Sequence, residues 1–315
     1  MKREQIIGGI LGVITGDALG LPVQFLSRQD VQKNPIKEMT GYGTFNTPPG
    51  TWSDDSSLTL CLVETLSSQG YDLTAIGQNF VRWFAAGHWT PFGRAFDIGG
   101  ATWEAMENLS SGVEPLLAGP AGERNNGNGS LMRILPAAIY FAGEEDSELV
   151  QKICAISRIT HGHPRSQLAC CLYALLVKEL LNGKSPVAAY AALQQKAATI
   201  FPGKALAGEL PHFERVLAGT LPVEPEERIK SSGYVVDTLE AAIWCLLNES
   251  SFAATLLTAV NLGEDTDTVG AVTGGLAGVY YGLTCIPDVW LKAIIHIDEI
   301  KSLCAQFVSS IKRVH

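Results

Sequence analysis

Two short acidic clusters lie near opposite ends of the chain, at residues 51–56 (TWSDDS) and 263–268 (GEDTDT). Each cluster mixes carboxylates with hydroxyls, and such oxygen donors are the ligands that hard divalent cations prefer. Neither cluster contains a His or Cys that would favour zinc or copper. If the fold brings the clusters together, they predict a site for Mg²⁺ or Mn²⁺. Two such cations about 4 Å apart make a hydrolytic centre.

The acidic clusters also have a simpler structural interpretation, because both directly precede apolar helical patterns. Ser53, or an Asp or Thr side chain, could cap the N-terminus of each helix. A cap uses one side chain, however, whereas three oxygen-bearing residues crowd each predicted helix start. Their mutual repulsion calls for a compensating cation and favours metal binding. Asp265 and Asp267 would diverge on a regular helix, so we expect them in the turn before it.

Three further segments carry groups that could bind a ligand. A glycine-rich turn is predicted at residues 127–130 (GNGS), opening a helix, and its backbone N–H groups would suit a phosphate, although most such turns are only turns. Residues 160–164 (THGHP) place two histidines two positions apart, which is not the spacing of a helical zinc site. One of them could cap a helix while the other is buried. Asp97 is either an N-cap or a charge directed at the site.

The elements that must position these groups are helices. Segments rich in Ala and Leu and without interior proline predict helices at residues 56–66, 73–83, 131–141, 167–181, 187–200, 238–247, 252–260 and 290–314. Glycine and proline fall between these segments, and alternating β-branched runs are scarce. The sequence therefore predicts an all-α fold. No shift in composition marks a boundary, so we expect a single domain spanning residues 1–315.

Glycines recur every four residues in two places, and this spacing bears on how the chain ends meet. They are Gly8, Gly12, Gly16 and Gly20 near the N-terminus, and Gly270, Gly274, Gly278 and Gly282 after the second acidic cluster. On a helix each set forms a ridge without side chains. A glycine inside a helix is destabilising by up to about 1 kcal/mol relative to Ala, and close helix approach is the usual reason to keep one. We expect the two ridges to pack together, which would place Asp17 and Gln24 beside the second acidic cluster.

Composition excludes several classes of partner. The 315 residues carry a formal net charge of −9 and no basic run, which argues against nucleic acid or an anionic membrane as the main partner. Seven cysteines without a CxxC pair indicate a reducing compartment, so we expect a cytoplasmic protein. The apolar stretches after Ile6 and at 269–287 are interpreted as buried helices rather than as a signal peptide or a membrane span, because Gly and polar residues interrupt them.

Taken in order, eight segments match one known family. They are residues 16–20 (GDALG), 41–44 (GYGT), 50–56 (GTWSDDS), 96–99 (FDIG), 127–133 (GNGSLMR), 160–164 (THGHP), 233–238 (GYVVDT) and 265–270 (DTDTVG). Together they resemble the ADP-ribosylglycohydrolase family, which includes the dinitrogenase reductase-activating glycohydrolases. The resemblance implies an all-α fold with two Mg²⁺ or Mn²⁺ ions in a cleft. It also implies hydrolysis of the N- or O-glycosidic bond between ADP-ribose and an arginine, a serine or a small molecule.

The resemblance also assigns residues. The implied metal ligands are Ser53, Asp54, Asp55, Asp265, Asp267 and Thr268. The residues that it places in the ADP-ribose cleft are Asp97, Gly127, Asn128, Gly129, Ser130, His161 and Tyr234. The expected partner is accordingly an ADP-ribosylated protein or small molecule.

One position departs from the family pattern. Family members commonly have a Glu in the stretch that reads LPVQF at residues 21–25, and here Gln24 can hydrogen-bond but cannot accept a proton. Losing a positioned base commonly lowers a rate by about 10² to 10⁴. Asp55 or Asp97 could serve as the base instead, or the chain could be a binding or structural relative with little turnover. A two-metal phosphoesterase, which would release AMP or phosphate from ADP-ribose, is a third interpretation.

Overall fold

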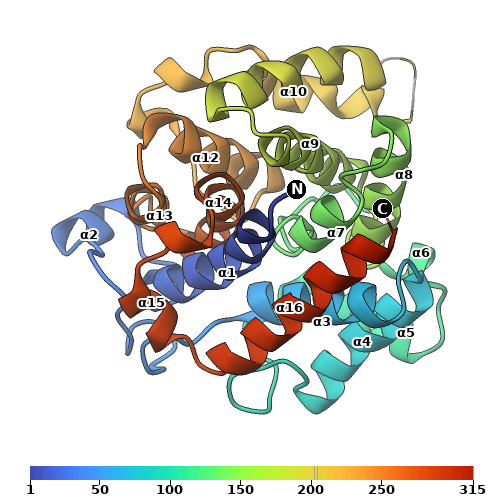
Figure 1. Cartoon of the computed structure of the whole chain (residues 1–315), viewed down its shortest axis with the longest axis horizontal. Coiled ribbons are helices and arrows are strands. Elements are labelled where there is room, and N and C mark those ends of the chain that lie inside the picture. The colour runs from blue at the N-terminus through green and yellow to red at the C-terminus, as the bar shows by residue number, and fades with distance from the viewer. Residues whose placement is uncertain (202, 204, 315) are drawn as a thin grey trace.

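The structure is a computed structural model that describes residues 1–201, 203 and 205–314 (Figure 1). Its α-helices are α1 (Arg3–Gly20), α2 (Arg28–Lys33), α3 (Asp54–Ser68), α4 (Leu73–Ala86), α5 (Gly100–Ser110), α6 (Pro115–Ala118), α7 (Leu135–Tyr140), α8 (Asp146–Arg158), α9 (Pro164–Leu181), α10 (Pro186–Ile200), α11 (Glu214–Leu217), α12 (Val235–Asn248), α13 (Phe252–Val260), α14 (Thr266–Tyr281), α15 (Asp288–Ala293) and α16 (Ile297–Val314). Short 3₁₀ turns are η1 (Leu21–Val23), η2 (Ala207–Phe213), η3 (Leu221–Val223), η4 (Glu226–Arg228) and η5 (Leu283–Cys285).

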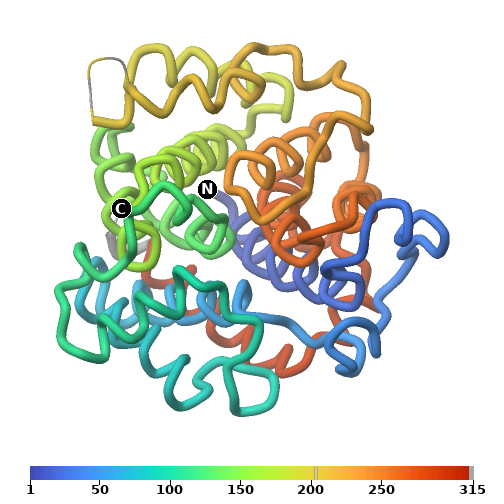
Figure 2. Tube along the Cα trace, turned by 180° about the vertical axis from the view of Figure 1, so that it is seen from behind, coloured from blue at the N-terminus to red at the C-terminus, as the bar shows by residue number. Residues whose placement is uncertain are grey.

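The all-α prediction is confirmed. The described residues contain no β-strand, and a single isolated antiparallel bridge joins Gly127 to Tyr234. The ribbon forms one compact helical body, and the views from both sides place α1 beside α14 in its interior (Figures 1 and 2). One hydrophobic cluster runs through this body and includes residues of both helices.

Helix α1 is the central helix of the core. It is apolar around its whole circumference, and every residue from Ile6 to Gly20 is buried. Arg3–Val23 is long and apolar enough to cross a membrane, yet 94% of its most apolar window is buried inside the protein. This burial matches the prediction of a buried core helix.

The two glycine ridges pack against each other, as their spacing predicts. A Cβ built on Gly12 would lie 2.1 Å from the carbonyl oxygen of Gly274, and one on Gly16 would lie 1.9 Å from that of Gly270. Contacts this short leave room only for hydrogen, so the backbones of α1 and α14 touch directly. This packing brings the end of α1 to the start of α14, where the second acidic cluster lies.

Two predicted helices differ from the structure. The helix expected at 131–141 begins only at Leu135, because residues 131–133 form turns in which the N–H groups of Leu131 and Met132 both donate to the Asn128 carbonyl. The segment expected as one helix at 290–314 is two helices, α15 and α16. His296 between them has φ +60°, a left-handed conformation that interrupts a helix.

Candidate active site

The two acidic clusters meet at the adjoining N-termini of α3 and α14. Asp54 and Asp55 lie in the first turn of α3, Asp265 is the residue before α14, and Asp267 lies in the first turn of α14. The hydroxyl of Thr268 donates to Asp55 Oδ2 at 3.4 Å and links the clusters directly. Asp265 precedes α14, as predicted. Asp267 lies inside the helix, so the prediction that it lies in the turn before α14 is wrong. Helix N-termini favour anions, so both helices help to hold these carboxylates.

Capping explains Ser53 but not the carboxylates beside it. The Ser53 hydroxyl accepts a hydrogen bond from the Asp55 N–H at 3.3 Å and is the N-cap of α3. Asp265 occupies the N-cap position of α14 and makes no side-chain cap bond. Helix capping therefore accounts for Ser53 alone among the side chains of the two clusters. The aspartates require another explanation.

Asp17 is a buried carboxylate that α1 contributes to the same region. Both of its oxygens lie 3.0 Å from the Ser53 N–H, and Oδ2 also accepts from the Ser56 N–H at 3.0 Å. An acidic side chain of one helix therefore caps another helix, which fixes α3 relative to α1. Burial raises the pKa of Asp17 to about 7, although the hydrogen bonds from Ser56 and Ser53 oppose the rise.

Three oxygen atoms at the floor of the site are buried and accept no hydrogen bond: Asp55 Oδ1, Asp267 Oδ2 and Gln24 Oε1. Burial is also the largest cause that raises the pKa values of Asp54, Asp55 and Asp267, and repulsion from the neighbouring carboxylates adds to it. Unpartnered buried oxygens that repel one another are the donor set that a cation would satisfy. Within the described residues, no group of three or more His, Cys, Asp or Glu side chains is arranged so that it could hold a metal ion by itself.

Asp97 and Gln24 lie against these carboxylates. Asp97 has φ +58° and precedes α5, whose N-cap is Gly99, so it is not a helix cap. Burial raises its pKa, and hydrogen bonds with Asp267 and Gln24 oppose the rise. A hydrogen bond from Gln24 also acts to lower the pKa of Asp265, which burial raises overall. Gln24 is 4% exposed and affects the pKa values of both carboxylates. A non-Gly residue held at positive φ is typical of functional sites.

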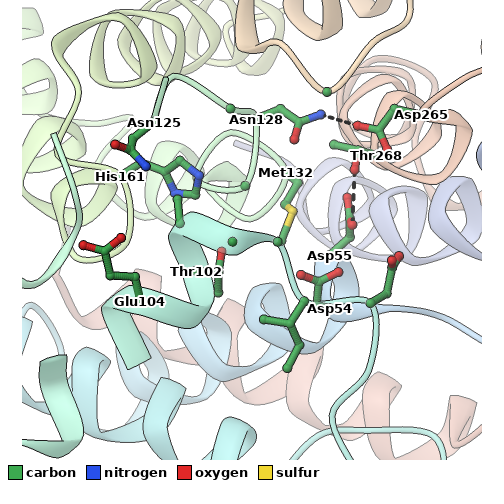
Figure 3. Close-up of a pocket in the computed structure, with 18 of the residues that line it drawn as sticks. Asp54, Asp55, Thr102, Glu104, Asn125, Asn128, Met132, His161, Asp265 and Thr268 are labelled. Atoms are coloured by element: carbon green, nitrogen blue, oxygen red, sulfur yellow. Dashed lines mark hydrogen bonds between the residues drawn. The ribbon is translucent and has the colours of Figure 1, made fainter. Parts of the chain in front are cut away.

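A cleft of about 810 Å³ opens above the acidic floor (Figure 3). Its walls carry Gln24, Asp54, Asp55, Asp97, Asp265 and Thr268 on one side, and Gly127, Asn128, Gly129 and His161 on the other. The Asn128 amide donates to Asp265 Oδ2 at 2.6 Å and joins the two walls. This volume is in the range of pockets that hold small-molecule ligands and cofactors.

The residues at 127–130 form a turn but do not open a helix. The Asn128 N–H donates to the Gly233 carbonyl, and this bond ties the turn to the segment before α12. Gly127, Asn128 and Gly129 line the cleft, whereas Ser130 is fully buried behind them, where its hydroxyl accepts from Ser157 at 2.9 Å. Tyr234 does not line this cleft, and its ring lies 5.9 Å from the Arg165 guanidinium.

The two histidines have different roles, as the simpler interpretation expected. His163 is the N-cap of α9 and accepts from the Arg165 N–H at 3.1 Å. His161 is the buried histidine, with 3% of its surface exposed, and it also lines the cleft.

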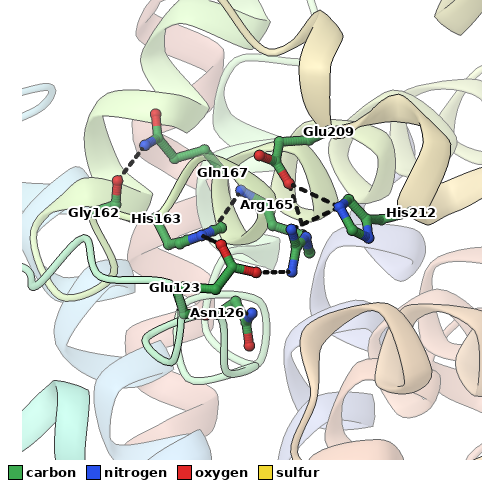
Figure 4. A network of polar contacts seen from close by, with 8 residues as sticks. All are labelled: Glu123, Asn126, Gly162, His163, Arg165, Gln167, Glu209 and His212. Carbon is green, nitrogen blue, oxygen red and sulfur yellow. Dashed lines mark hydrogen bonds and ion pairs between the residues drawn. The ribbon is translucent and has the colours of Figure 1, made fainter.

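A polar network beside the cleft includes Glu123, which directly precedes two residues that line the cleft (Figure 4). Arg165 donates to Glu123 at 3.0 Å and to Glu209 at 2.8 Å, and Glu123 also bonds to His163 at 3.2 Å. Glu123 directly precedes Arg124 and Asn125, which line the cleft.

Several residues that line the cleft were not predicted from the sequence. They are Phe25, Ile98, Gly99, Gly100, Ala101, Thr102, Glu104, Arg124, Asn125, Met132 and Gly233. The polar run at residues 123–126 (ERNN), close before the predicted GNGS turn, was the one available signal for Arg124 and Asn125. Ile98, Gly99, Met132 and Gly233 lie inside segments that match the family, although none of them was singled out as a site residue. The remaining residues come from α5 and from the loop at Phe25.

The fold and site define a helical domain with an acidic cleft large enough for a small-molecule ligand, and comparison with known proteins gives the family. The family model described as ADP-ribosylglycohydrolase matches residues 1–314. An ADP-ribosylarginine hydrolase (Tri1) of Serratia proteamaculans is 34% identical over 95% of this chain and 77% of its own length. An ADP-ribosyl-[dinitrogen reductase] glycohydrolase of Rhodospirillum rubrum is 31% identical over 93% of this chain and 90% of its own length. A solved structure described as an ADP-ribosylglycohydrolase-related protein complex superposes with a TM-score of 0.82 at 33% identity, covering 98% of each chain.

The chain therefore belongs to the ADP-ribosylglycohydrolase family and is a glycohydrolase enzyme.

Proposed function

We propose that this enzyme hydrolyses the glycosidic bond between ADP-ribose and an acceptor at a site that holds two Mg²⁺ or Mn²⁺ ions. The observation that carries the proposal is the meeting of the two acidic clusters, with the buried oxygens Asp55 Oδ1 and Asp267 Oδ2 left without partners at the floor of the cleft. Such oxygens are the donors that a hard divalent cation takes. The relative from Serratia proteamaculans makes arginine the first acceptor to test.

The residues that would hold the cations are Ser53, Asp54, Asp55, Asp265, Asp267 and Thr268. When bound, cations of this kind orient hydroxyl oxygens and stabilise charge that develops during hydrolysis. The chain itself supplies the rest. The opposite wall, with its glycine turn and His161, is polar and suited to the phosphates of a nucleotide, while the acidic floor suits the ribose hydroxyls.

The base that activates water is proposed to be Asp97 or Asp55. Asp97 is the better placed, because it lines the cleft, is partly exposed and is not needed as a cation ligand. Gln24 occupies the position where the family commonly has Glu, and it cannot accept a proton. An alternative follows from this substitution: a chain that binds ADP-ribose and turns it over weakly. We also propose a cytoplasmic location and no nucleic acid or membrane as main partner.

The test is release of free ADP-ribose from an arginine-linked substrate, with Mg²⁺, with Mn²⁺ and with a chelator. We expect metal-dependent release by the native chain and loss of at least about 10²-fold in Asp267→Asn. Asp288→Asn is the matched control, because its carboxylate lies on α15 and is 79% exposed. Full activity in the presence of the chelator would contradict the metal centre. Release of AMP or phosphate would support the phosphoesterase interpretation instead, and binding without release would support the weak relative.

A further inference from the structure

Arg133 is a buried cation without a carboxylate partner. It is fully buried, and its guanidinium carbon lies 4.6 Å from the centre of the Phe80 ring. Its Nη2 donates to the Thr160 hydroxyl at 2.6 Å and to the Ile156 carbonyl at 3.3 Å, while Nε and Nη1 find no acceptor. None of the ion pairs in the described part of the chain includes it. Burying an unpaired charge is destabilising, so this arginine calls for a functional reason.

The hydrogen bond from Arg133 determines how the next two groups are protonated. An arginine can only donate, so Thr160 Oγ1 is the acceptor in that bond. The one O–H of Thr160 is then free to donate, and its remaining neighbour is His161 Nδ1 at 2.9 Å. If His161 were instead protonated at Nδ1, Thr160 would receive two donors and its own buried O–H would be left without an acceptor. The chain of bonds therefore makes Nδ1 the acceptor and places the imidazole proton on Nε2.

The Nε2 edge of His161 faces the cleft. The ring lies against the glycine turn, since a Cβ built on Gly129 would be 2.7 Å from Cε1 and one built on Gly127 would be 3.8 Å from Nε2. Nε2 has no hydrogen-bond partner among the described residues, and Figure 3 shows the ring among the side chains that line the pocket. Burial, with repulsion from Arg133 added, lowers the pKa of His161 to about 3, so the ring is neutral at physiological pH. Burial lowers the pKa of Arg133 to about 10, and it therefore stays charged.

We propose that Arg133 and Thr160 are positioning residues that hold His161 as a neutral Nε2–H donor to a phosphate oxygen of the ADP-ribosyl group. The proposal rests on the proposed function and assigns one wall of its cleft. A phosphate is the appropriate ligand for two reasons. The imidazole edge can only donate, and the buried positive charge two hydrogen bonds behind it attracts an anion. On the opposite wall the carboxylates would repel the same phosphate, so the ligand enters in one orientation.

The first part of the test needs no substrate. Imidazole ¹⁵N NMR of the native chain reports which ring nitrogen of His161 carries the proton. We expect a single Nε2–H form, and an Nδ1–H form would overturn the proposal directly. Thr160→Val removes the hydroxyl and should give a mixture of both forms, while Thr160→Ser should restore the native spectrum. Thr273→Val is the matched control, because this buried hydroxyl has no hydrogen-bond partner and lies on α14.

The second part measures binding of ADP-ribose and of adenosine, which lacks phosphates, to the same variants. Binding then weakens in proportion to the share of His161 that leaves the Nε2–H form, so Thr160→Val and Arg133→Met should each weaken ADP-ribose binding by about twofold or more. Adenosine binding should be unchanged. In turnover, KM should rise with little change in kcat. Equal weakening for both ligands, or unchanged ADP-ribose binding, would refute the phosphate contact. If the native chain binds ADP-ribose as expected but releases none from a conjugate, the proposed function fails while this inference stands.

Discussion

Replacing Gly12 with alanine should both destabilise the protein and disable its site. The new methyl group would lie 2.1 Å from the Gly274 carbonyl oxygen, whereas ordinary contacts begin at 3.4 Å, so the two backbones must separate by roughly 1.3 Å (3.4 − 2.1). Overpacking of this kind commonly destabilises by about 1–3 kcal/mol. Because the obstructing atoms belong to the backbone, we expect the net loss in the free energy of unfolding to reach the upper end of this range, about 3 kcal/mol. This value already includes the helix-propensity gain of about 1 kcal/mol from Gly to Ala.

The same separation should reach the active site, because α1 is followed by η1 and then Gln24, and α14 begins directly after Asp265. A displacement of about 1 Å in a catalytic group can lower a rate by about 10²-fold. The matched control is Gly77→Ala in the middle of α4. Its new methyl group would meet only side-chain atoms, the nearest being Leu109 Cδ2 at 3.2 Å, so it should keep or gain stability and keep full activity.

The assay is thermal and urea unfolding of both variants, with ADP-ribose release measured in parallel. In a chain of this size each kcal/mol shifts Tm by roughly 2 °C, so Gly12→Ala should melt about 6 °C below the native chain. A Gly12→Ala variant as stable and as active as Gly77→Ala would refute the reasoning that direct backbone contact between α1 and α14 sets the geometry of the site.

Three further predictions concern the site itself. Saturating Mg²⁺ should raise the free energy of unfolding, by about 2.7 kcal/mol at a concentration of 100 Kd, and calorimetry should find no such gain in Asp267→Asn. Gln24→Glu should raise kcat by about 10²-fold or more if the missing base limits turnover, and an unchanged kcat would assign that role to Asp97 or Asp55. The pKa of His161 falls from about 6.5 unfolded to about 3 folded, so the unfolded chain takes up the proton first and the free energy of unfolding decreases as pH falls from 6.5 towards 3. Urea midpoints of His161→Gln should depend less on pH over this range than those of the native chain.

The sequence was most informative where one local pattern had one physical explanation. Glycines every four residues predict close helix contact, and α1 and α14 touch where these ridges meet. Oxygen-rich residues before two helices predict a cation site on the condition that the clusters meet, and Thr268 donates to Asp55 across their junction.

At several positions tertiary contacts override the local preference of the sequence. Residues 131–133 have helix-forming side chains, yet the carbonyl of Asn128 captures two of their N–H groups and delays α7 to Leu135. The role of Asp17 as a cap for α3 could not be predicted from spacing, because it depends on how α1 crosses the start of another helix. The hydrogen bonds from Arg133 through Thr160 to His161 likewise join the turns before α7 and α9. The sequence shows both segments but not that they meet.

Repulsion among the active-site carboxylates should lower the free energy of unfolding when no cation is bound, and this effect can be measured. The glycine ridge holds Asp267 close to Asp55, and repulsion from Asp55 helps to raise the pKa of Asp267. Without a cation, removing the Asp267 charge should therefore stabilise the chain while it abolishes turnover. The gain in the free energy of unfolding from Asp267→Asn should be smaller in a Gly12→Ala background, because the separated helices have already relieved part of the repulsion. In a double-mutant cycle, the coupling between contacting groups is typically about 0.5–3 kcal/mol. Strictly additive effects in metal-free buffer would mean that the ridge does not force the carboxylates together. A coupling that vanishes or reverses in Mg²⁺ would mean that the cation turns a repulsive cluster into a stabilising one.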